Sequence, residues 1–258
     1  MDDLQSLAKK KAELLKLKEN KKHQHIEHIY HQKISGKYLG DFVYGANDGI
    51  ITTFSVAAGA LGASFSPAVV LVLGFANIIA DGISMGIGAY SSVKSEEEYN
   101  KGQRKKEEWE IDNLRPIETA EIKEIYKEKG FTGENLEQAV NVITGNKKVW
   151  VDEMMKNELG IIENNLGDPA KHGIATFLAF LIAGLIPLSA FLFQLPINIA
   201  SQISIVFTGI ALFSVGASRQ LISPVKWYKG GLENLTVGSL AAAAAFIVGN
   251  IIEKLVVH

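Results

Sequence analysis

Long apolar runs separated by polar stretches dominate the pattern of this chain. Each run has about the length that a helix needs to cross a bilayer, roughly 20 residues. The runs lie close to 42–63, 68–90, 173–194, 199–217 and 235–252. Only a few residues separate the first run from the second, and the third from the fourth. The pattern therefore predicts an all-α membrane protein with five transmembrane helices.

The stretch from 94 to 171 is too polar to enter a bilayer and carries helix signals of its own. No proline lies between Pro67 and Pro116, so the second span is expected to continue as one helix to about Asn113. Glycine and proline at typical helix ends delimit three more helices. These helices are expected at 117–129, 134–143 and 146–165.

Four segments follow from these patterns: an N-terminal segment, two spans, an inserted helical domain and three further spans. Their boundaries are expected at 1–37, 38–93, 94–171 and 172–258. Leucines among lysines in the first segment predict an amphipathic helix that lies on anionic lipid or on another subunit. Its histidines at 25, 28 and 31 share a face, either as a patch that gathers metal or as ordinary polar surface.

The basic residues indicate the orientation of the chain. All but one of the 26 Lys and Arg residues lie before the first span, between the second and third spans, or between the fourth and fifth. Cytosolic loops of membrane proteins are enriched in these residues. The N-terminus and residues 94–171 are therefore expected in the cytosol, and the C-terminus across the membrane.

Two carboxylates interrupt the first two apolar runs. Asp48 is the only formal charge in the first run, and Asp81 is the only one in the second, with Asn77 one turn before it and Met85 one turn after. An ionisable residue at membrane depth is costly and usually marks an ion path or a proton relay. The alternative is a carboxyl near a helix end that reaches interfacial water.

The polar region carries a second group of candidate ligands. Acidic pairs three residues apart share a helix face, and two methionines lie within a turn of another carboxylate. Carboxylate oxygens suit hard or borderline divalent cations, and thioethers shift the preference toward transition metals such as Fe²⁺ or Mn²⁺. Solvated helix faces and ordinary core methionines remain the alternative. The candidate residues are Glu107, Glu110, Glu118, Glu121, Met154, Met155 and Glu158.

A carboxylate and a thioether recur at membrane depth, in Asp48 and Met85. Similar ligands in the polar domain and in the membrane indicate capture of a metal ion followed by its passage. Low dielectric favours the neutral carboxyl, whereas a bound cation favours the ionised form. Metal and proton would therefore compete for Asp48, which is the minimum that proton-coupled exchange requires.

Composition narrows the function classes further. The chain has no cysteine, which excludes disulfides and thiolate metal sites. The first 37 residues are too polar for a cleavable signal. The net charge of −2 gives no indication of a nucleic-acid partner. No prosthetic group is expected, and Fe²⁺ or Mn²⁺ would be a bound and transported ion.

Taken together, these residues resemble the vacuolar iron transporter family, which includes the yeast calcium-cross-complementing iron/manganese transporters. The likeness runs from Asp41 to the C-terminus. It is carried by Asp48-Gly49, Ala57-Ala58-Gly59-Ala60, Ile83-Ser84-Met85-Gly86, Lys94-Ser95-Glu96, Glu118-x-x-Glu121 and Met154-Met155-Lys156-x-Glu158-Leu159-Gly160.

The resemblance implies a transporter, not an enzyme: a homodimer with five spans and a cytosolic metal-binding domain between helices two and three. It implies export of Fe²⁺, and often Mn²⁺, in exchange for protons. Asp48 and Met85 match the family's membrane site, and the acidic and methionine residues of the polar region match its cytosolic ligands. The host membrane would be the plasma membrane in a prokaryote and a vacuole-like membrane in a eukaryote.

One departure leaves the proton path open. Plant members carry a glutamate where this chain has Asn77, and Asp81, one turn on, is the candidate to replace it. Two other function classes fit the sequence less well. A di-iron oxidase needs Glu-x-x-His pairs, and the sequence has none. A membrane-anchored metal sensor would have no need of Asp48 and Asp81. Spacing fixes neither the choice between Fe²⁺ and Mn²⁺ nor the proton stoichiometry.

Overall fold

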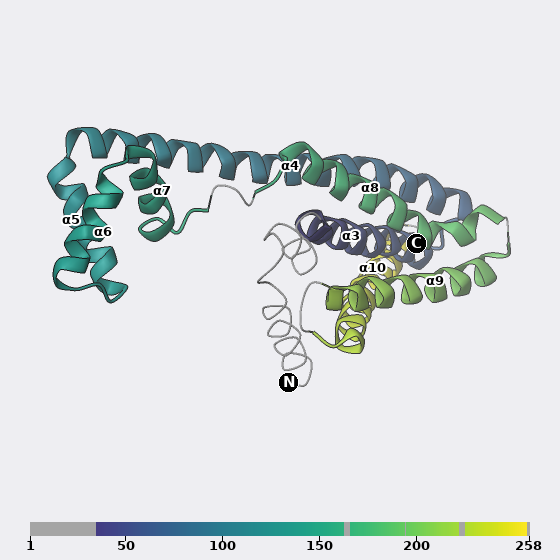
Figure 1. The fold of residues 1–258 in the computed structure, drawn as a ribbon. Helices are drawn as coiled ribbons and strands as arrows, with labels where there is room; N and C mark the ends of the chain where they lie inside the picture. The colour runs from purple at the N-terminus through teal and green to yellow at the C-terminus, as the bar shows by residue number, and fades with distance from the viewer. Residues whose placement is uncertain (1–34, 163–165, 194, 222–224, 257–258) are drawn as a thin grey trace, which may run out of the picture.

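The computed structural model describes residues 35–162, 166–193, 195–221 and 225–256, and within them it contains helices and no strand. The amphipathic helix and the histidines expected before residue 35 lie outside this part of the chain. Figure 1 labels the elements. They are α3 (Ser35–Gly62), α4 (Pro67–Asn113), α5 (Arg115–Glu128), α6 (Gly133–Thr144), α7 (Lys147–Asn157), α8 (Pro169–Leu188), η3 (Ser189–Phe193), α9 (Ile197–Ser218), η4 (Arg219–Leu221) and α10 (Trp227–Val256).

Four helical segments are long and apolar enough to cross a membrane: α4, α8 with η3, α9 with η4, and α10. They match the second to fifth predicted runs and confirm a helical membrane protein. The first predicted run forms α3, which has 28 residues but is not among the four. Asn47, Asp48, Thr52 and Thr53 make its middle polar. A fifth span through α3 therefore stays a prediction.

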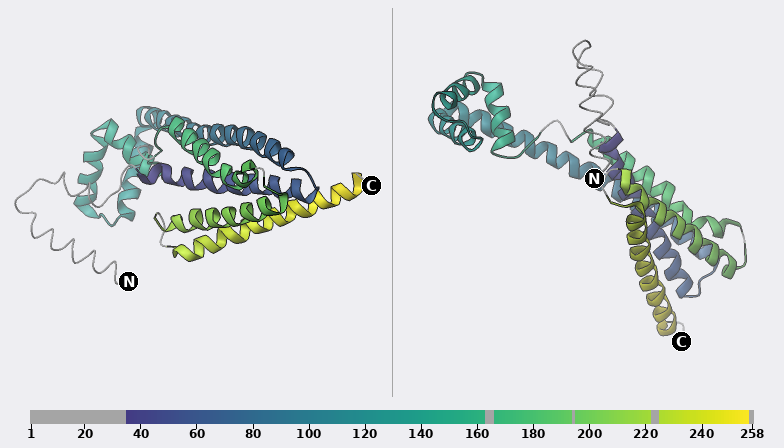
Figure 2. Two further views of the ribbon diagram at one scale, coloured as in Figure 1. Left: turned by 90° about the vertical axis from the view of Figure 1, so that its right-hand side faces the viewer. Right: turned by 60° about the horizontal axis from the view of Figure 1, so that its bottom comes forward.

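Helix α3 lies in the centre of the bundle. It packs against α8, α10, α4 and α9, and the left view of Figure 2 shows it between α4 and α8 on one side and α9 and α10 on the other. None of the residues from Gly45 to Gly62 is exposed, whereas α10 exposes large apolar side chains such as Leu240 and Phe246. A helix covered by other helices need not be apolar, because its polar groups do not face lipid.

Glycines allow this central position. Side chains at Gly45 and Gly49 would collide with the backbone carbonyls of Thr176 and Phe180 on α8. Small residues four apart let transmembrane helices approach closely. The Gly45–Gly49 pair therefore serves the close packing of α3 on α8.

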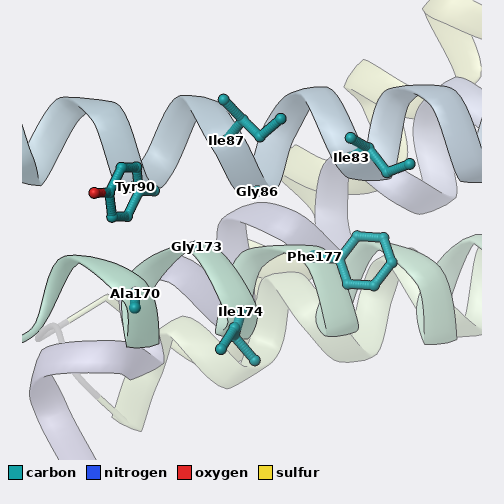
Figure 3. A pocket seen from close by; sticks show the side chains of 8 residues that line it. All are labelled: Ile83, Gly86, Ile87, Tyr90, Ala170, Gly173, Ile174 and Phe177. Atoms are coloured by element: carbon teal, nitrogen blue, oxygen red, sulfur yellow. The ribbon is translucent and has the colours of Figure 1, made fainter.

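Helices α4 and α8 make a similar contact at Gly86 and Gly173, shown in Figure 3. A Cβ atom on Gly86 would lie 3.0 Å from the carbonyl oxygen of Gly173. Beside this contact is a groove of about 370 Å³ lined mainly by apolar side chains, among them Ile87, Ile174 and Phe177. Such a lining offers lipid or protein a surface but offers a cation no ligands.

Helix α4 extends well beyond the bundle. Its 47 residues correspond to roughly 70 Å, and the expected end at Asn113 is confirmed. The protruding half carries α5, α6 and α7, as Figure 1 shows. Residues 94–162 are called the insert domain below. Its core is formed by Ile111, Ile122, Leu136, Val140, Ile143, Trp150, Val151, Met154 and Met155.

The last helix of the insert domain is shorter than predicted. Helix α7 ends at Asn157 instead of continuing to residue 165. Glu158 caps it, and Gly160 then has a positive φ of 68°. Glycine adopts this conformation readily and commonly ends helices. The chain therefore turns away at Gly160, before the glycine–aspartate–proline signal at 167–169 is reached.

Several helix ends lie together at one end of the bundle. The start of α3, the insert domain, the end of η4 and the start of α10 are at this end, whereas α10 ends at the opposite end (Figure 2). Which end faces the cytosol stays a prediction from the basic residues.

Candidate functional site

The insert domain buries two carboxyl groups. Glu107 lies on α4, and Glu118 lies in the first turn of α5, just after the turn at Leu114. Their exposed fractions are 2% and 4%. Carboxylates are almost never so deeply buried without a charged partner. These two residues are therefore the strongest indication of a site in this domain.

Burial is the main cause of a raised pKa at both groups. It raises the pKa of Glu107 to about 7, with further contributions from the negative charges of Glu158 and Glu110. It also raises the pKa of Glu118 to about 7, and there the charges of Glu121 and Glu107 add to the effect. The five acidic candidates therefore lie close enough to influence one another's ionisation.

Two oxygens in this group lack a hydrogen-bond donor. In the part of the chain that the structure describes, Oε2 of Glu107 and Oε2 of Glu118 are buried and accept no hydrogen bond. A buried acceptor without a partner is costly. A cation between the two carboxyls would satisfy both oxygens and relieve their repulsion.

The arrangement is not a closed coordination sphere. Among the described residues, no three His, Cys, Asp or Glu side chains are placed as a ready metal site. Met154 and Met155 are buried in the apolar core of the insert domain, at 0% and 2% exposure. This position fits the core-filling role that the sequence left open. Whether their sulfur atoms also bind metal stays a prediction.

The bundle brings the two membrane carboxylates together. Asp48 on α3 and Asp81 on α4 are both half-buried, and their charges interact. Asn77, Asp81 and Met85 recur every four residues and so share one face of α4. The amide nitrogen of Asn77 is buried and has no acceptor among the described residues. Asp48 and Asp81 are therefore neighbours, and Asn77 and Met85 lie one turn on either side of Asp81. That these four residues form a transport path stays a prediction.

Helix α3 is also tied to α10 next to Asp48. Nδ2 of Asn234 donates to Oδ1 of Asn47 at 2.9 Å. Asn234 is 6% exposed, although it lies just outside the apolar run that predicted the last span. The hydrophobic pattern does not indicate Asn234 for that reason. In the sequence, Asn234 is an uncharged polar residue in the first turns of a span. Such a residue is usually interpreted as lying at the membrane interface.

The VIT family model matches residues 39–250 of this chain, which is most of its length. The chain belongs to the VIT family. Two relatives are 32% identical: the vacuolar iron transporter of Plasmodium berghei, over 92% of this chain and 91% of the relative, and that of Centaurea cyanus, over 88% and 93%. Vacuolar iron transporter 1 of Arabidopsis thaliana is 31% identical over 85% and 88%.

Membership of the VIT family confirms the resemblance that the sequence motifs carried. The proteins of this family are transporters, so this chain is a transporter in a membrane and not an enzyme. The match includes both Asp48 and the insert domain. Both candidate sites therefore lie in the part of the chain that defines the family.

Proposed function

We propose that this transporter exports Fe²⁺, Mn²⁺ or both from the cytosol in exchange for protons. The observation that carries the proposal is that one long helix bears acidic groups both in the insert domain and in the membrane bundle. Helix α4 bears the buried Glu107 in the insert domain and Asp81 beside Asp48 in the bundle. The names of the relatives, which are vacuolar iron transporters, support iron as a substrate.

Capture would take place in the insert domain. Buried carboxyls whose pKa is raised to about 7 are partly protonated at neutral pH, and a divalent cation that binds there displaces protons. The flexible acidic side chains around them complete the ligand set once the ion is present. The proposed ligands are Glu107, Glu110, Glu118, Glu121, Met154, Met155 and Glu158.

Passage would take place where α3 meets α4. Asp48 supplies an oxygen ligand and Met85 a sulfur ligand. Asp81 takes the role of the glutamate that plant relatives carry at the position of Asn77, and it alternates between a proton and interaction with the ion. A cation near Asp48 and Asp81 neutralises their mutual repulsion, whereas protons do so when the site is empty. Exchange of the one for the other is the proposed coupling step.

The topology that supports this cycle has five spans. Helix α3, the first along the chain, adds one span to α4, α8, α9 and α10, and the helices around it cover its polar middle. The insert domain is on the cytosolic side, where the basic residues concentrate. We place the protein as a homodimer in a plasma membrane or a vacuole-like membrane.

The alternative is a membrane-anchored metal sensor that binds without transport, and flux separates the two. Purified protein is reconstituted into liposomes, and entry of Fe²⁺ and of Mn²⁺ is measured with and without an imposed pH gradient. The proposal predicts flux that increases when protons can move in the opposite direction. Metal binding without flux in either condition would favour a sensor.

A further inference from the structure

A buried histidine lies where the chain returns from the insert domain to the bundle. His172 is in the first turn of α8 and is 8% exposed. Its Nδ1 atom lies 2.7 Å from Oδ2 of Asp41 on α3. Its Nε2 atom lies 2.7 Å from the carbonyl oxygen of Leu166. Both ring nitrogens therefore contact oxygen atoms.

These contacts define how many protons the pair holds. A backbone carbonyl can only accept, so Nε2 must carry a hydrogen. An ionised carboxylate also only accepts, and a neutral imidazole has just one N–H group. Both short contacts are satisfied when the ring is an imidazolium, or equivalently when the shared proton lies on Asp41. The pair thus holds one proton more than a neutral histidine beside an ionised aspartate.

The surroundings favour a positive ring. The ring of Tyr38 on α3 lies 4.7 Å from the imidazole, centroid to centroid, and aromatic rings attract cations. The hydroxyl of Tyr38 also accepts a hydrogen bond from the backbone N–H of Asp168 at 3.3 Å. Among the described residues, the other ionisable side chains near this position are Tyr90 of α4, which packs on Gly173, and Asp168 and Lys171, which precede the ring in the chain.

The residue between Leu166 and Asp168 leaves no space for a side chain. Gly167 has a φ of 79°, and a Cβ atom there would lie 2.9 Å from Nε2 of His172 and 3.2 Å from the hydroxyl of Tyr38. Residues 166–168 therefore lie against Tyr38 of α3 and His172 of α8. Helix α8 itself packs closely on α4 at Gly173 (Figure 3).

We infer that His172 and Asp41 form a protonated pair that positions the return segment of the insert domain on α3. Asp41 precedes Asp48 by seven residues and so lies on the same face of α3. The pair joins the insert domain to the helix that carries the membrane carboxylate. When the proton leaves, one of the two short contacts is lost, and the hold on residues 166–168 weakens. Neither His172 nor Asp41 is among the proposed metal ligands.

The proton itself is the first thing to measure. Nitrogen-15 NMR of histidine-labelled full-length protein in detergent reports whether each ring nitrogen carries a hydrogen, and the His172→Gln spectrum assigns the signal. Two protonated ring nitrogens at neutral pH are the expected result, or a ring with a hydrogen on Nε2 alone beside a protonated Asp41, which the carbon-13 shift of the Asp41 carboxyl reports. A neutral His172 ring beside an ionised Asp41 at neutral pH would overturn the inference. If His172→Gln fails to fold, the change that Asp41→Asn causes in the same signal supplies the assignment.

The consequence is measured by amide hydrogen exchange in a peptide that contains residues 166–168. The range is about pH 5 to pH 8, in which histidines change charge, and rates are corrected for the intrinsic effect of pH. Exchange in the wild type should rise with pH. Asp41→Asn and His172→Gln should exchange roughly tenfold faster at low pH, the effect of losing one hydrogen bond to a charged group, and should show little further change.

Two more variants distinguish the effect of the His172–Asp41 pair from a general change in stability. Gly167→Ala should speed exchange at low pH without changing a titratable group. Lys171→Gln removes an exposed charge from the adjacent position and should match the wild type. A wild-type profile that is flat with pH, or a Lys171→Gln profile as altered as that of His172→Gln, would contradict the inference. Because no metal is present in these measurements, their outcome is independent of whether the protein transports iron.

Discussion

The two buried glutamates of the insert domain should destabilise the metal-free protein. Glu107 and Glu118 are 2% and 4% exposed, and burial raises the pKa of each to about 7. The double variant Glu107→Gln, Glu118→Gln keeps the shape of both side chains and removes both charges. It should therefore be more stable than the wild type at alkaline pH while losing the response to metal.

The sign follows from the numbers of bound protons. An ordinary glutamate ionises near pH 4.5 when the chain unfolds, whereas these groups keep their protons in the folded state up to about pH 7. The folded state thus binds more protons between these values, and stability falls as the pH rises through this range. A pKa raised from 4.5 to about 7 corresponds to about 3 kcal/mol for one group. Because the charge of Glu107 is part of the reason that the pKa of Glu118 is raised, the two contributions do not simply add, and we expect about 3–5 kcal/mol for the pair.

The tryptophans provide a local assay. Trp150 is fully buried in the core of the insert domain, whereas Trp109 and Trp227 are exposed. Replacing the two exposed residues with phenylalanine leaves a fluorescence signal that reports on the insert domain alone. Urea unfolding of the full-length protein in detergent, with a chelator present, is then followed at about pH 5 and about pH 8.

The wild type should lose stability between the two pH values, and the double variant should lose much less. Adding Fe²⁺ or Mn²⁺ at about pH 8 should stabilise the wild type by about 2.7 kcal/mol at a concentration one hundred times the dissociation constant, with no such gain in the variant. The exposed Glu128→Gln is the matched control and should follow the wild type. Wild-type stability that is unchanged by pH, or equal stabilisation of the double variant by metal, would refute the reasoning.

Three further predictions concern the bundle. Met85→Leu should slow metal flux with little effect on the proposed dimer, and loss of a wild-type dimer on size exclusion would instead assign Met85 to packing. Gly49→Ala should lower the stability in thermal unfolding by about 1–3 kcal/mol through overpacking. Gly88→Ala is the control and should not, because no described atom lies within 4 Å of the added Cβ. Equal effects of the two substitutions would contradict the close approach of α3 and α8. Asn234→Leu should remove the bond to Asn47, cost about 1 kcal/mol and slow flux in liposomes, and unchanged stability and flux would show that the bond is dispensable.

Much of the fold follows from the hydrophobic pattern. Helices α4, α8, α9 and α10 face lipid on one side, so their apolar composition reports directly on the membrane. The central α3 is different because its neighbours cover it, and Asn47, Asp48 and the threonines lower its apolar character without preventing burial. A composition rule built on contact with lipid therefore describes the outer helices better than the inner one.

The acidic site could be predicted only in outline. Spacing predicts that Glu107 and Glu110 share a face, but it does not predict that Glu107 is almost fully buried and Glu110 is not. That difference depends on how α5 and α7 pack on the end of α4. The sequence predicted a helix end at residue 165 instead of Asn157, because the positive φ of Gly160 arises only in the folded turn.

Contacts between distant segments could not be predicted at all. His172 and Asp41 belong to different helices, α8 and α3, and Asn234 of α10 contacts Asn47 of α3. Asp41, His172 and Asn234 each lie in the first turns of a long helix, where a polar side chain is usually explained by interfacial water. Only the arrangement of the helices shows that they are paired inside the protein.

The most direct test of the central claim compares the wild type with Asp48→Asn in liposomes. The substitution keeps the size of the side chain and removes its charge, while Fe²⁺ entry and the opposing proton movement are recorded together. We predict that a pH gradient drives Fe²⁺ entry in the wild type and that both movements cease in the variant, although it folds, inserts and still binds metal in the insert domain. Undiminished, proton-coupled Fe²⁺ entry through Asp48→Asn would contradict the account.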